Sequence, residues 1–169
     1  RISLSDPSQI KVDAELSTPI RSWSFRNAYA GILGIAERIE DFRAADADVQ
    51  KAAVGEYRSD RDASRISYTV KLPKPTPADV SHVSWLVEDR GVLMLADLLP
   101  QDLSNLSIEL VLPAGWSVET SNTRLDKARY EVVAPERAVF FVGSALRKTS
   151  NTVEGISFDL VLSGGWTFK

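Results

Sequence analysis

The most informative absence in this sequence is cysteine. The 169 residues contain none, which excludes disulfide bridges, a thiol nucleophile, cysteine-ligated zinc and iron–sulfur clusters. Histidine is nearly absent too, since His82 is the only one. A single histidine excludes the zinc-peptidase motif His-Glu-x-x-His within these residues, and the glycine patterns of nucleotide-binding loops and serine hydrolases are missing. The chain therefore carries none of the common catalytic motifs.

Long hydrophobic runs and an excess of one charge are also lacking. No apolar run approaches the ~20 residues that cross a bilayer as a helix. The 20 basic and 23 acidic residues are interspersed and leave a net charge of −3, without the basic stripe of a nucleic-acid-binding protein. With 44% hydrophobic and 25% charged residues, the composition is that of a folded domain. We therefore expect a globular domain with no membrane span and no nucleic-acid partner.

Alternation of apolar and polar residues dominates what is present. It is clearest in Ile10–Leu16, Ile66–Leu72 and Leu106–Leu112. Because successive side chains of a strand point to opposite faces, each of these segments suits a strand with one buried face. Further strand candidates, separated by turns rich in proline and glycine, are Ile20–Phe25, Ile39–Ala44, Val49–Val54, His82–Val87, Val92–Leu95, Ser117–Thr120, Tyr130–Val133, Ala138–Val142 and Ile156–Leu162. The pattern predicts an all-β fold, an antiparallel β-sandwich that forms a single domain over residues 1–169.

One segment departs from this alternation. Its apolar residues recur at intervals of three and four, at Tyr29, Ile32, Leu33, Ala36 and Ile39. Asn27 suits an N-cap, because its side chain can accept a hydrogen bond from the first turn of a helix. Gly31 and Gly34 weaken a helix by up to ~1 kcal/mol each relative to alanine, but they allow close packing against a neighbour. We predict one short helix near residues 28–39 that covers an open end of the sandwich.

Acidic residues are the first candidates for chemistry. Asp41, Asp46 and Asp48 lie close together in the sequence, and clustered oxygen ligands are what a hard cation such as calcium requires. The glycine and closing glutamate of a calcium-binding loop are missing here, so solvated loop charge is the favoured interpretation. A self-contained hydrolase built on acidic residues has only this cluster as support. His82 has no partners at catalytic spacing and is interpreted as an ordinary strand or turn histidine.

Tryptophans are the second candidates. Trp23, Trp85, Trp116 and Trp166 lie in or next to predicted strands. A row of exposed aromatic rings on a sandwich can stack on sugars, whereas a tryptophan in an alternating strand more often fills the core. A free-standing binding module for glycan or protein ligands therefore stays open as an alternative function.

Both ends of the sequence suggest a longer parent chain. The chain begins at Arg1 without a methionine, as a mature exported protein would after removal of its signal. At the other end, Ile156–Lys169 reads as a strand, a Gly-Gly turn and the start of another apolar element. We expect the chain to be the N-terminal fragment of a longer protein.

Several stretches from residue 66 onward resemble a known family. They are Ile66–Leu72, Asp89–Leu95, Ile108–Thr120, Arg129–Val133 and Phe140–Ser144. In this order they resemble the N-terminal β-domain of glycyl-aminopeptidase-type gluzincin metallopeptidases, over residues 60 to 169. Leu162–Phe168 is similar to the strand that leads into the catalytic domain of that family. One departure is that Trp23–Tyr29 lacks the Pro-Gly that such domains often carry at this place.

The resemblance implies a non-catalytic accessory domain of an exported bacterial zinc aminopeptidase-like enzyme. The zinc cofactor and the catalytic residues would belong to the following domain, so this chain would hold no catalytic residue and no metal ligand. Its partners would be its own C-terminal catalytic domain and, through the parent enzyme, a peptide substrate, in the periplasm or outside the cell. Candidate residues for the interface with the catalytic domain are Tyr29, Ile32, Trp166 and Phe168.

Overall fold

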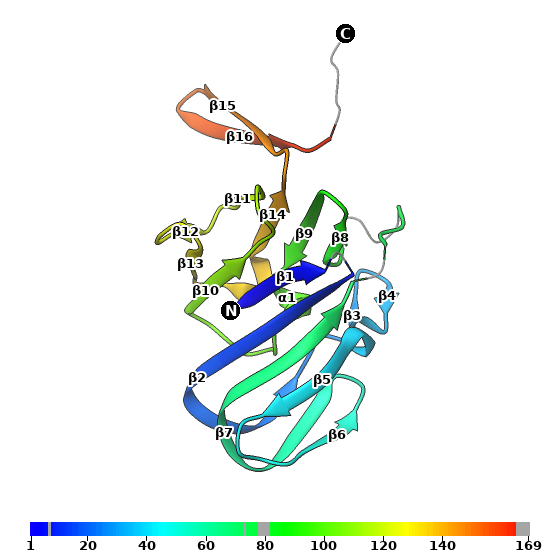
Figure 1. Cartoon of the computed structure of the whole chain (residues 1–169). Helices are drawn as coiled ribbons and strands as arrows, with labels where there is room; N and C mark the ends of the chain where they lie inside the picture. The colour runs from blue at the N-terminus through cyan, green and yellow to red at the C-terminus, as the bar shows by residue number, and fades with distance from the viewer. Residues whose placement is uncertain (7, 73, 78–81, 165–169) are drawn as a thin grey trace.

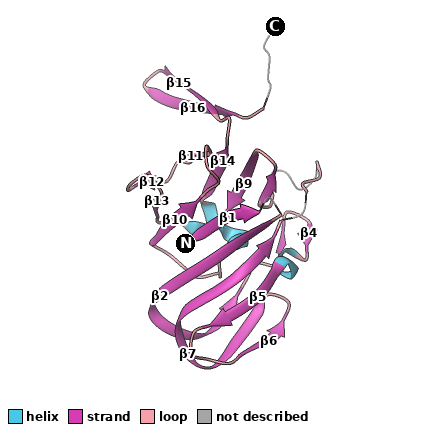
Figure 2. Cartoon of the chain, viewed as in Figure 1, coloured by secondary structure: helices cyan, strands magenta, loops and turns pink. Residues whose placement is uncertain are grey.

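Strands dominate the computed structural model, which describes residues 1–6, 8–72, 74–77 and 82–164 (Figures 1 and 2). Within these residues, helical structure is confined to the 3-10 turns η1 (Ile35–Arg38) and η2 (Pro135–Arg137) and the single-turn helix α1 (Leu95–Leu98). Most strands pair antiparallel, and only β1 and β10 run parallel among the pairs of the described chain. The predicted all-β, sandwich-like architecture is confirmed.

The larger of the two main sheets has eight strands. In spatial order they are β12 (Thr123–Arg124), β13 (Arg129–Val132), β10 (Leu106–Val111), β1 (Ile2–Asp6), β2 (Gln9–Ser24), β7 (Glu56–Lys71) and β5 (Ile39–Ala44), with β6 (Val49–Ala53) also paired to β7. The smaller sheet has the order β11 (Ser117–Glu119), β14 (Val139–Gly143), β9 (Arg90–Met94) and β8 (Trp85–Val87).

The two longest strands of the large sheet, β2 and β7, have 16 residues each and pair with each other. Their register places Ile10 beside Val70 and Val12 beside Tyr68, and all four side chains are buried because the alternation puts them on the same face. The register then shifts between Glu15 and Ser22, as at a β-bulge, which bends a strand. Two separately predicted segments of β2 are therefore one bent strand.

The core lies between the two sheets. The small sheet contributes Leu86, Leu93, Phe140 and Val142, which are nearly or fully buried and lie on one face by register. Helix α1 adds Leu95 and Leu98 to the same cluster. The alternating apolar positions of both sheets thus meet in one continuous core.

A cluster of aromatic rings extends this core within the bent part of the large sheet. Phe42 stacks on Tyr57 with ring centroids 4.3 Å apart, and Phe25 meets Tyr68 edge to face at 5.1 Å. Trp23 completes the cluster at 5.2 Å from Phe42. Such pairs stabilise by about 0.5–1.5 kcal/mol beyond the area that they bury, so these rings tie β2, β5 and β7 together.

The helix predicted near residues 28–39 forms only in part. The segment holds a small hairpin, β3 (Ala28–Tyr29) and β4 (Ile32–Leu33), and only η1 is helical. Gly31 and Gly34 have φ values of +87° and +74°, which lie in the left-handed region and break a helix. Asn27 is not the N-cap, which is Gly34 of η1, but its side-chain oxygen accepts the N–H of Ala36 in η1 at 3.2 Å. The prediction of a continuous helix was wrong because the two glycines turn the chain.

A second hairpin, β15 (Arg147–Val153) and β16 (Ile156–Leu162), forms a two-stranded sheet of its own. It stands off the rest of the molecule, at the top of Figure 1 in orange and red. It follows β14 directly along the chain, and Gly164, the last described residue, lies at its base.

Candidate docking surface

The small sheet has an apolar face turned away from the core. Its register places Trp85, Val92 and Phe141 in one row across β8, β9 and β14, and Met94 and Val139 in the next row. We call these five residues the outer face. An antiparallel sheet that covers a core with one face normally presents polar side chains on the other. Phe141 is 43% exposed, Trp85, Met94 and Val139 are half-buried, and Val92 is buried. By register Glu119 of β11 and Arg90 of β9 lie on the same side, so the outer face is an apolar strip bordered by charge and is open mainly at Phe141.

A cleft of about 220 Å³ adjoins the outer face, and Trp85 belongs to both. Its lining residues are Ile32, Leu33, Gly34, Ile35, Arg38, Pro75, Val83, Ser84 and Trp85. Ile32, a predicted interface residue, therefore lines the cleft. Tyr29, the second predicted interface residue in this region, pairs with Ile32 in the β3–β4 hairpin and is 47% exposed. The His82 ring lies 6.2 Å from the Tyr29 ring.

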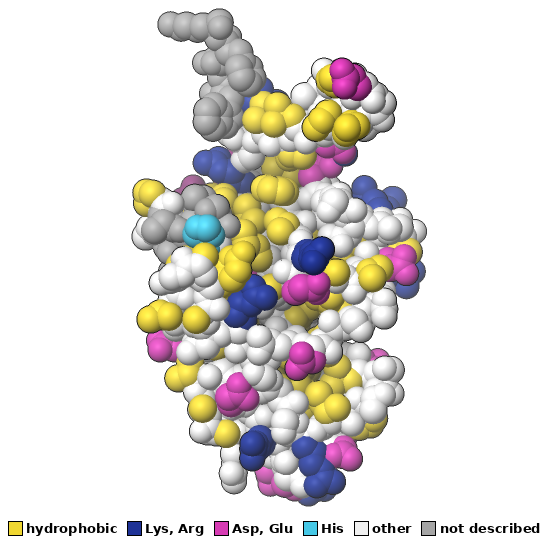
Figure 3. Space-filling model, turned by 180° about the vertical axis from the view of Figure 1, so that it is seen from behind, with side chains coloured by type: hydrophobic (Ala, Val, Ile, Leu, Met, Phe, Trp, Pro, Cys, Tyr) yellow, Lys and Arg dark blue, Asp and Glu magenta, His cyan; other side chains and the backbone are white. Residues whose placement is uncertain are grey.

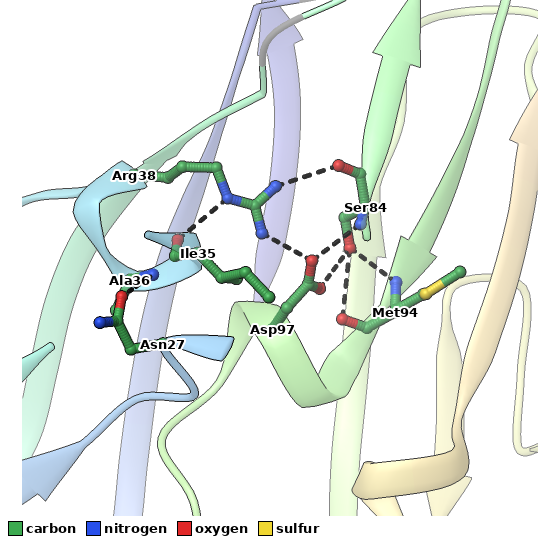
Figure 4. Close-up of polar contacts among 7 residues, drawn as sticks. All are labelled: Asn27, Ile35, Ala36, Arg38, Ser84, Met94 and Asp97. Carbon is green, nitrogen blue, oxygen red and sulfur yellow. Dashed lines mark hydrogen bonds and ion pairs between the residues drawn. The ribbon is translucent and has the colours of Figure 1, made fainter. Parts of the chain in front are cut away.

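Arg38, which lines this cleft, forms a buried ion pair with Asp97 (Figure 4). Arg38 Nη2 lies 2.6 Å from Asp97 Oδ2, and the two side chains are only 12% and 3% exposed. The guanidinium also donates to the carbonyls of Ile35 and Ser84, each at 3.1 Å. Asp97 accepts from the backbone N–H and the hydroxyl of Ser84 at 2.8 and 2.6 Å.

This cluster joins the two halves of the sandwich. Arg38 comes from η1, directly before β5 of the large sheet, whereas Ser84 and Asp97 come from segments that flank the small sheet. A buried ion pair loses the hydration of both charges, so it is tolerated only where hydrogen bonds satisfy the remaining polar groups. Because the carboxylate and the guanidinium are used in this way, the cluster holds the cleft's shape.

The β15–β16 hairpin has one apolar and one polar face. Register and alternation place Ile156, Phe158 and Leu160 of β16 on the same face as Val153 of β15. All four side chains are at least half exposed. Seen from behind in Figure 3, hydrophobic side chains gather on the hairpin and continue over the body below it.

The opposite face of the hairpin is held by polar contacts. Lys148 Nζ lies 2.9 Å from Asp159 of β16 and 3.3 Å from Glu119 of β11, which ties the hairpin to the small sheet. The Ser150 hydroxyl donates to Asp159 at 2.6 Å. This bond and the Lys148 ammonium lower the pKa of Asp159, while the same two carboxylates raise the pKa of Lys148. The polar face is thus occupied, and the apolar face is not covered by described residues.

The acidic cluster predicted from the sequence does not form a site within the described residues. Asp41, Asp46 and Asp48 are exposed, and Asp46 lies 4.0 Å from the guanidinium of Arg65. The Asp48 N–H donates to the Asp60 carboxylate at 3.0 Å. In the part of the chain that the structure describes, no three His, Cys, Asp or Glu side chains come together to hold a metal.

The tryptophans are separated as well. Trp23 is buried in the aromatic cluster, and Trp85 and Trp116 are half-buried. Trp166 and Phe168, the remaining predicted interface residues, lie outside the described residues. The three described tryptophans therefore make no exposed row that could stack on a sugar.

The sequence does contain a pattern that indicates the outer face, although it is not an alternation of apolar and polar residues. Val92–Leu95 and Val139–Val142 are unbroken apolar runs. Such runs are typical of strands that are buried on both faces. They indicate that the side of the small sheet away from the core is also meant to be covered.

We compared the chain with known families, curated proteins and solved structures to find proteins with the same fold. No family model matches the chain, and no curated protein matches it. A solved structure does: the crystal structure of an aminopeptidase N family protein from Idiomarina loihiensis aligns with a TM-score of 0.77 over 97% of this chain, at 16% identity. This chain shares the fold of part of that protein. It covers 32% of the length of that protein's chain. No helix among the described residues is long and apolar enough to cross a membrane.

Proposed function

We propose that this chain is the non-catalytic N-terminal accessory domain of an exported, gluzincin-type zinc aminopeptidase. The fold shared with part of an aminopeptidase N family protein supports this proposal. So does the series of short motifs between residues 60 and 169. The observation that carries it is the outer face, because exposed apolar patches on a sheet mark sites where another domain or protein packs.

In this role the domain packs on the following catalytic domain and helps to form the wall of its substrate cleft. Covering a fully exposed phenylalanine side chain is worth about 1.5–3 kcal/mol, and Phe141 is 43% exposed, so its burial would contribute about 1 kcal/mol to such packing. The cleft beside Trp85 extends the same surface and is held open by the Arg38–Asp97 pair.

Zinc belongs to the partner domain in this proposal, where it would polarise the scissile carbonyl and activate a water molecule. The described residues do not fit a metal, since they bring no three ligands together. We therefore assign no catalytic step to this chain. Its contribution is the position of the cleft wall.

Peptidase assays test the proposal. The natural polypeptide that contains this chain should cleave aminoacyl-p-nitroanilides, and a zinc chelator should abolish that turnover. The isolated 169-residue chain with added Zn²⁺ should show none. Zinc-dependent turnover by the isolated chain, or a natural polypeptide that ends at Lys169, would contradict the proposal.

A second candidate function is a free-standing module that binds a protein ligand. The same apolar outer face and cleft favour it. The two candidates differ in where the partner lies: in the same polypeptide for the accessory domain, and in a separate molecule for the binding module.

A further inference from the structure

The β15–β16 hairpin has a free edge along β16. Within the described residues the hairpin is a sheet of only two strands. Alternate backbone N–H and C=O groups of β16 bond to β15, and the others point away from it. A two-stranded hairpin is marginally stable on its own in water, and three strands or a packed face are needed for independent stability.

Three of the four side chains on the apolar face of the hairpin, Ile156, Phe158 and Leu160, belong to β16, the strand with this free edge. Phe158 pairs with Asn151 and Leu160 with Thr149, so the apolar row of β16 has polar neighbours on β15. Cross-strand neighbours on one face normally match in character. The missing apolar neighbours of Phe158 and Leu160 are therefore expected on the other side of β16.

The two edges of the hairpin differ in charge. Proteins block exposed strand edges with lysine, proline or other charged residues. β15 carries Arg147 and Lys148, whereas β16 carries one charge, Asp159, which Lys148 and Ser150 already bind on the polar face. The β16 edge is thus the one that is left open for pairing.

We propose that β16 accepts a third strand, supplied by the polypeptide that follows this chain. This inference rests on the proposed accessory-domain function. The path of the chain supports that occupant: Gly164, two residues beyond β16, is held at the base of the hairpin by Arg147, which donates to its carbonyl at 3.1 Å, so the polypeptide leaves the hairpin from the β16 strand. The occupant is an extended segment with apolar residues at alternate positions, opposite Phe158 and Leu160. Its backbone pairs with β16 and its side chains extend the apolar face.

Amide hydrogen exchange at single-residue resolution tests the strand pairing. In the isolated chain, the β16 amides that point away from β15 should exchange nearly freely. In the natural polypeptide they should slow by about 100-fold or more, because a paired edge amide must open before it exchanges. Exchange of the β16 amides that face β15 serves as the internal check that the hairpin is folded.

Two variants of adjacent residues sharpen this test. Phe158→Lys places a charge on the apolar face and should remove the protection of the outward β16 amides in the natural polypeptide. Ser157→Lys places the same charge on the polar face and should leave that protection intact. Equal effects of the two variants would contradict the proposal.

The outcomes separate this inference from the function on which it rests. Unprotected outward amides together with a covered Phe141 would overturn the strand pairing and leave the docking domain standing. If the outward β16 amides and Phe141 were both exposed in the natural polypeptide, the strand pairing and the accessory-domain function would both be overturned. Protection of these amides in the isolated chain that grows with its concentration would make a second copy the occupant and overturn the proposal.

Discussion

The β2–β7 pair and the β15–β16 pair are both regular antiparallel pairs with alternating side chains, yet they differ completely in burial. Val12 and Val70 are hidden in the core, whereas Phe158 and Leu160 are at least half exposed. The small sheet stands between these extremes, with one buried face and one apolar outer face that is partly open. Alternation determines which side chains share a face, but a second element must be present to bury that face.

The comparison therefore separates stability from docking. The core, the aromatic cluster and the Arg38–Asp97 pair should determine whether the chain folds. The outer face and the hairpin should contribute little until a partner covers them. Substitutions of the same kind in the two regions should differ sharply in effect.

The largest difference is expected for two phenylalanines. Phe140 is fully buried, and Phe140→Ala should lower the free energy of unfolding of the isolated chain by about 4 kcal/mol through a core cavity. Phe158 is 56% exposed, and Phe158→Ala should change it by less than about 0.5 kcal/mol. Urea denaturation of both variants measures this contrast. Similar losses would show that the hairpin is part of the folded core.

The buried ion pair should come next. Asp97→Ala leaves the Arg38 guanidinium without its carboxylate and removes the acceptor of two Ser84 hydrogen bonds. We expect a loss of about 3 kcal/mol in the same assay, because an uncompensated buried charge is costly. The surface pair on the hairpin provides the control: Lys148→Ala should cost much less, because solvent screens an exposed ion pair. A loss for Asp97→Ala as small as that for Lys148→Ala would contradict the role of the cluster.

Two glycines with similar backbone angles test packing alone. Gly55 and Gly155 have φ values of +75° and +81°. A Cβ atom on Gly55 would lie 2.6 Å from the Cβ of Ala36, whereas one on Gly155 meets open space. Gly155→Ala should cost about 1 kcal/mol for the left-handed backbone, and Gly55→Ala about 2 kcal/mol or more because of the added clash. Thermal unfolding of both variants would show whether this order holds.

The smallest effect is a pH dependence confined to the hairpin. The Ser150 hydrogen bond and the Lys148 ammonium lower the pKa of Asp159 from its ordinary value of 3.8. The stabilisation from this carboxylate is therefore fully present above that value and disappears as the pH falls through the lower pKa of the folded state. NMR signals of β15 and β16 should show loosening of the hairpin in that range, and Asp159→Asn should remove this pH dependence. A loosening that persists in Asp159→Asn would point to another group.

Much of the fold follows from the sequence, because alternation is a local signal. The predicted segment Ile39–Ala44 is β5 and Ile156–Leu162 is β16, residue for residue. The strand β15 was missed because Arg147–Val153 is almost entirely polar, and its extended form depends on pairing with β16. The start of β7 was missed for the same reason. Such strands are defined by their neighbours rather than by their own pattern.

The candidate surface was predictable only in part. Tyr29 and Ile32 were expected at an interface, and the structure places them beside an apolar cleft, although on a hairpin rather than a helix. The ion pair between Arg38 and Asp97 joins residues 59 positions apart, and no local sequence pattern predicts it. The outer face was signalled by the apolar runs of β9 and β14, but only the register shows that Phe141 and Trp85 share a row with Val92.

Thiol labelling tests the central claim, that the outer face is covered by the domain that follows. Because the chain has no cysteine, Phe141→Cys introduces a single thiol at a defined place in it. In the isolated chain this thiol should alkylate freely, and in the natural polypeptide at least about tenfold more slowly, read out by mass spectrometry of its peptide. Val133→Cys, at a position 65% exposed and outside the docking surface, should react equally in both. Equal reactivity of the position-141 thiol in the isolated chain and the natural polypeptide would contradict the account.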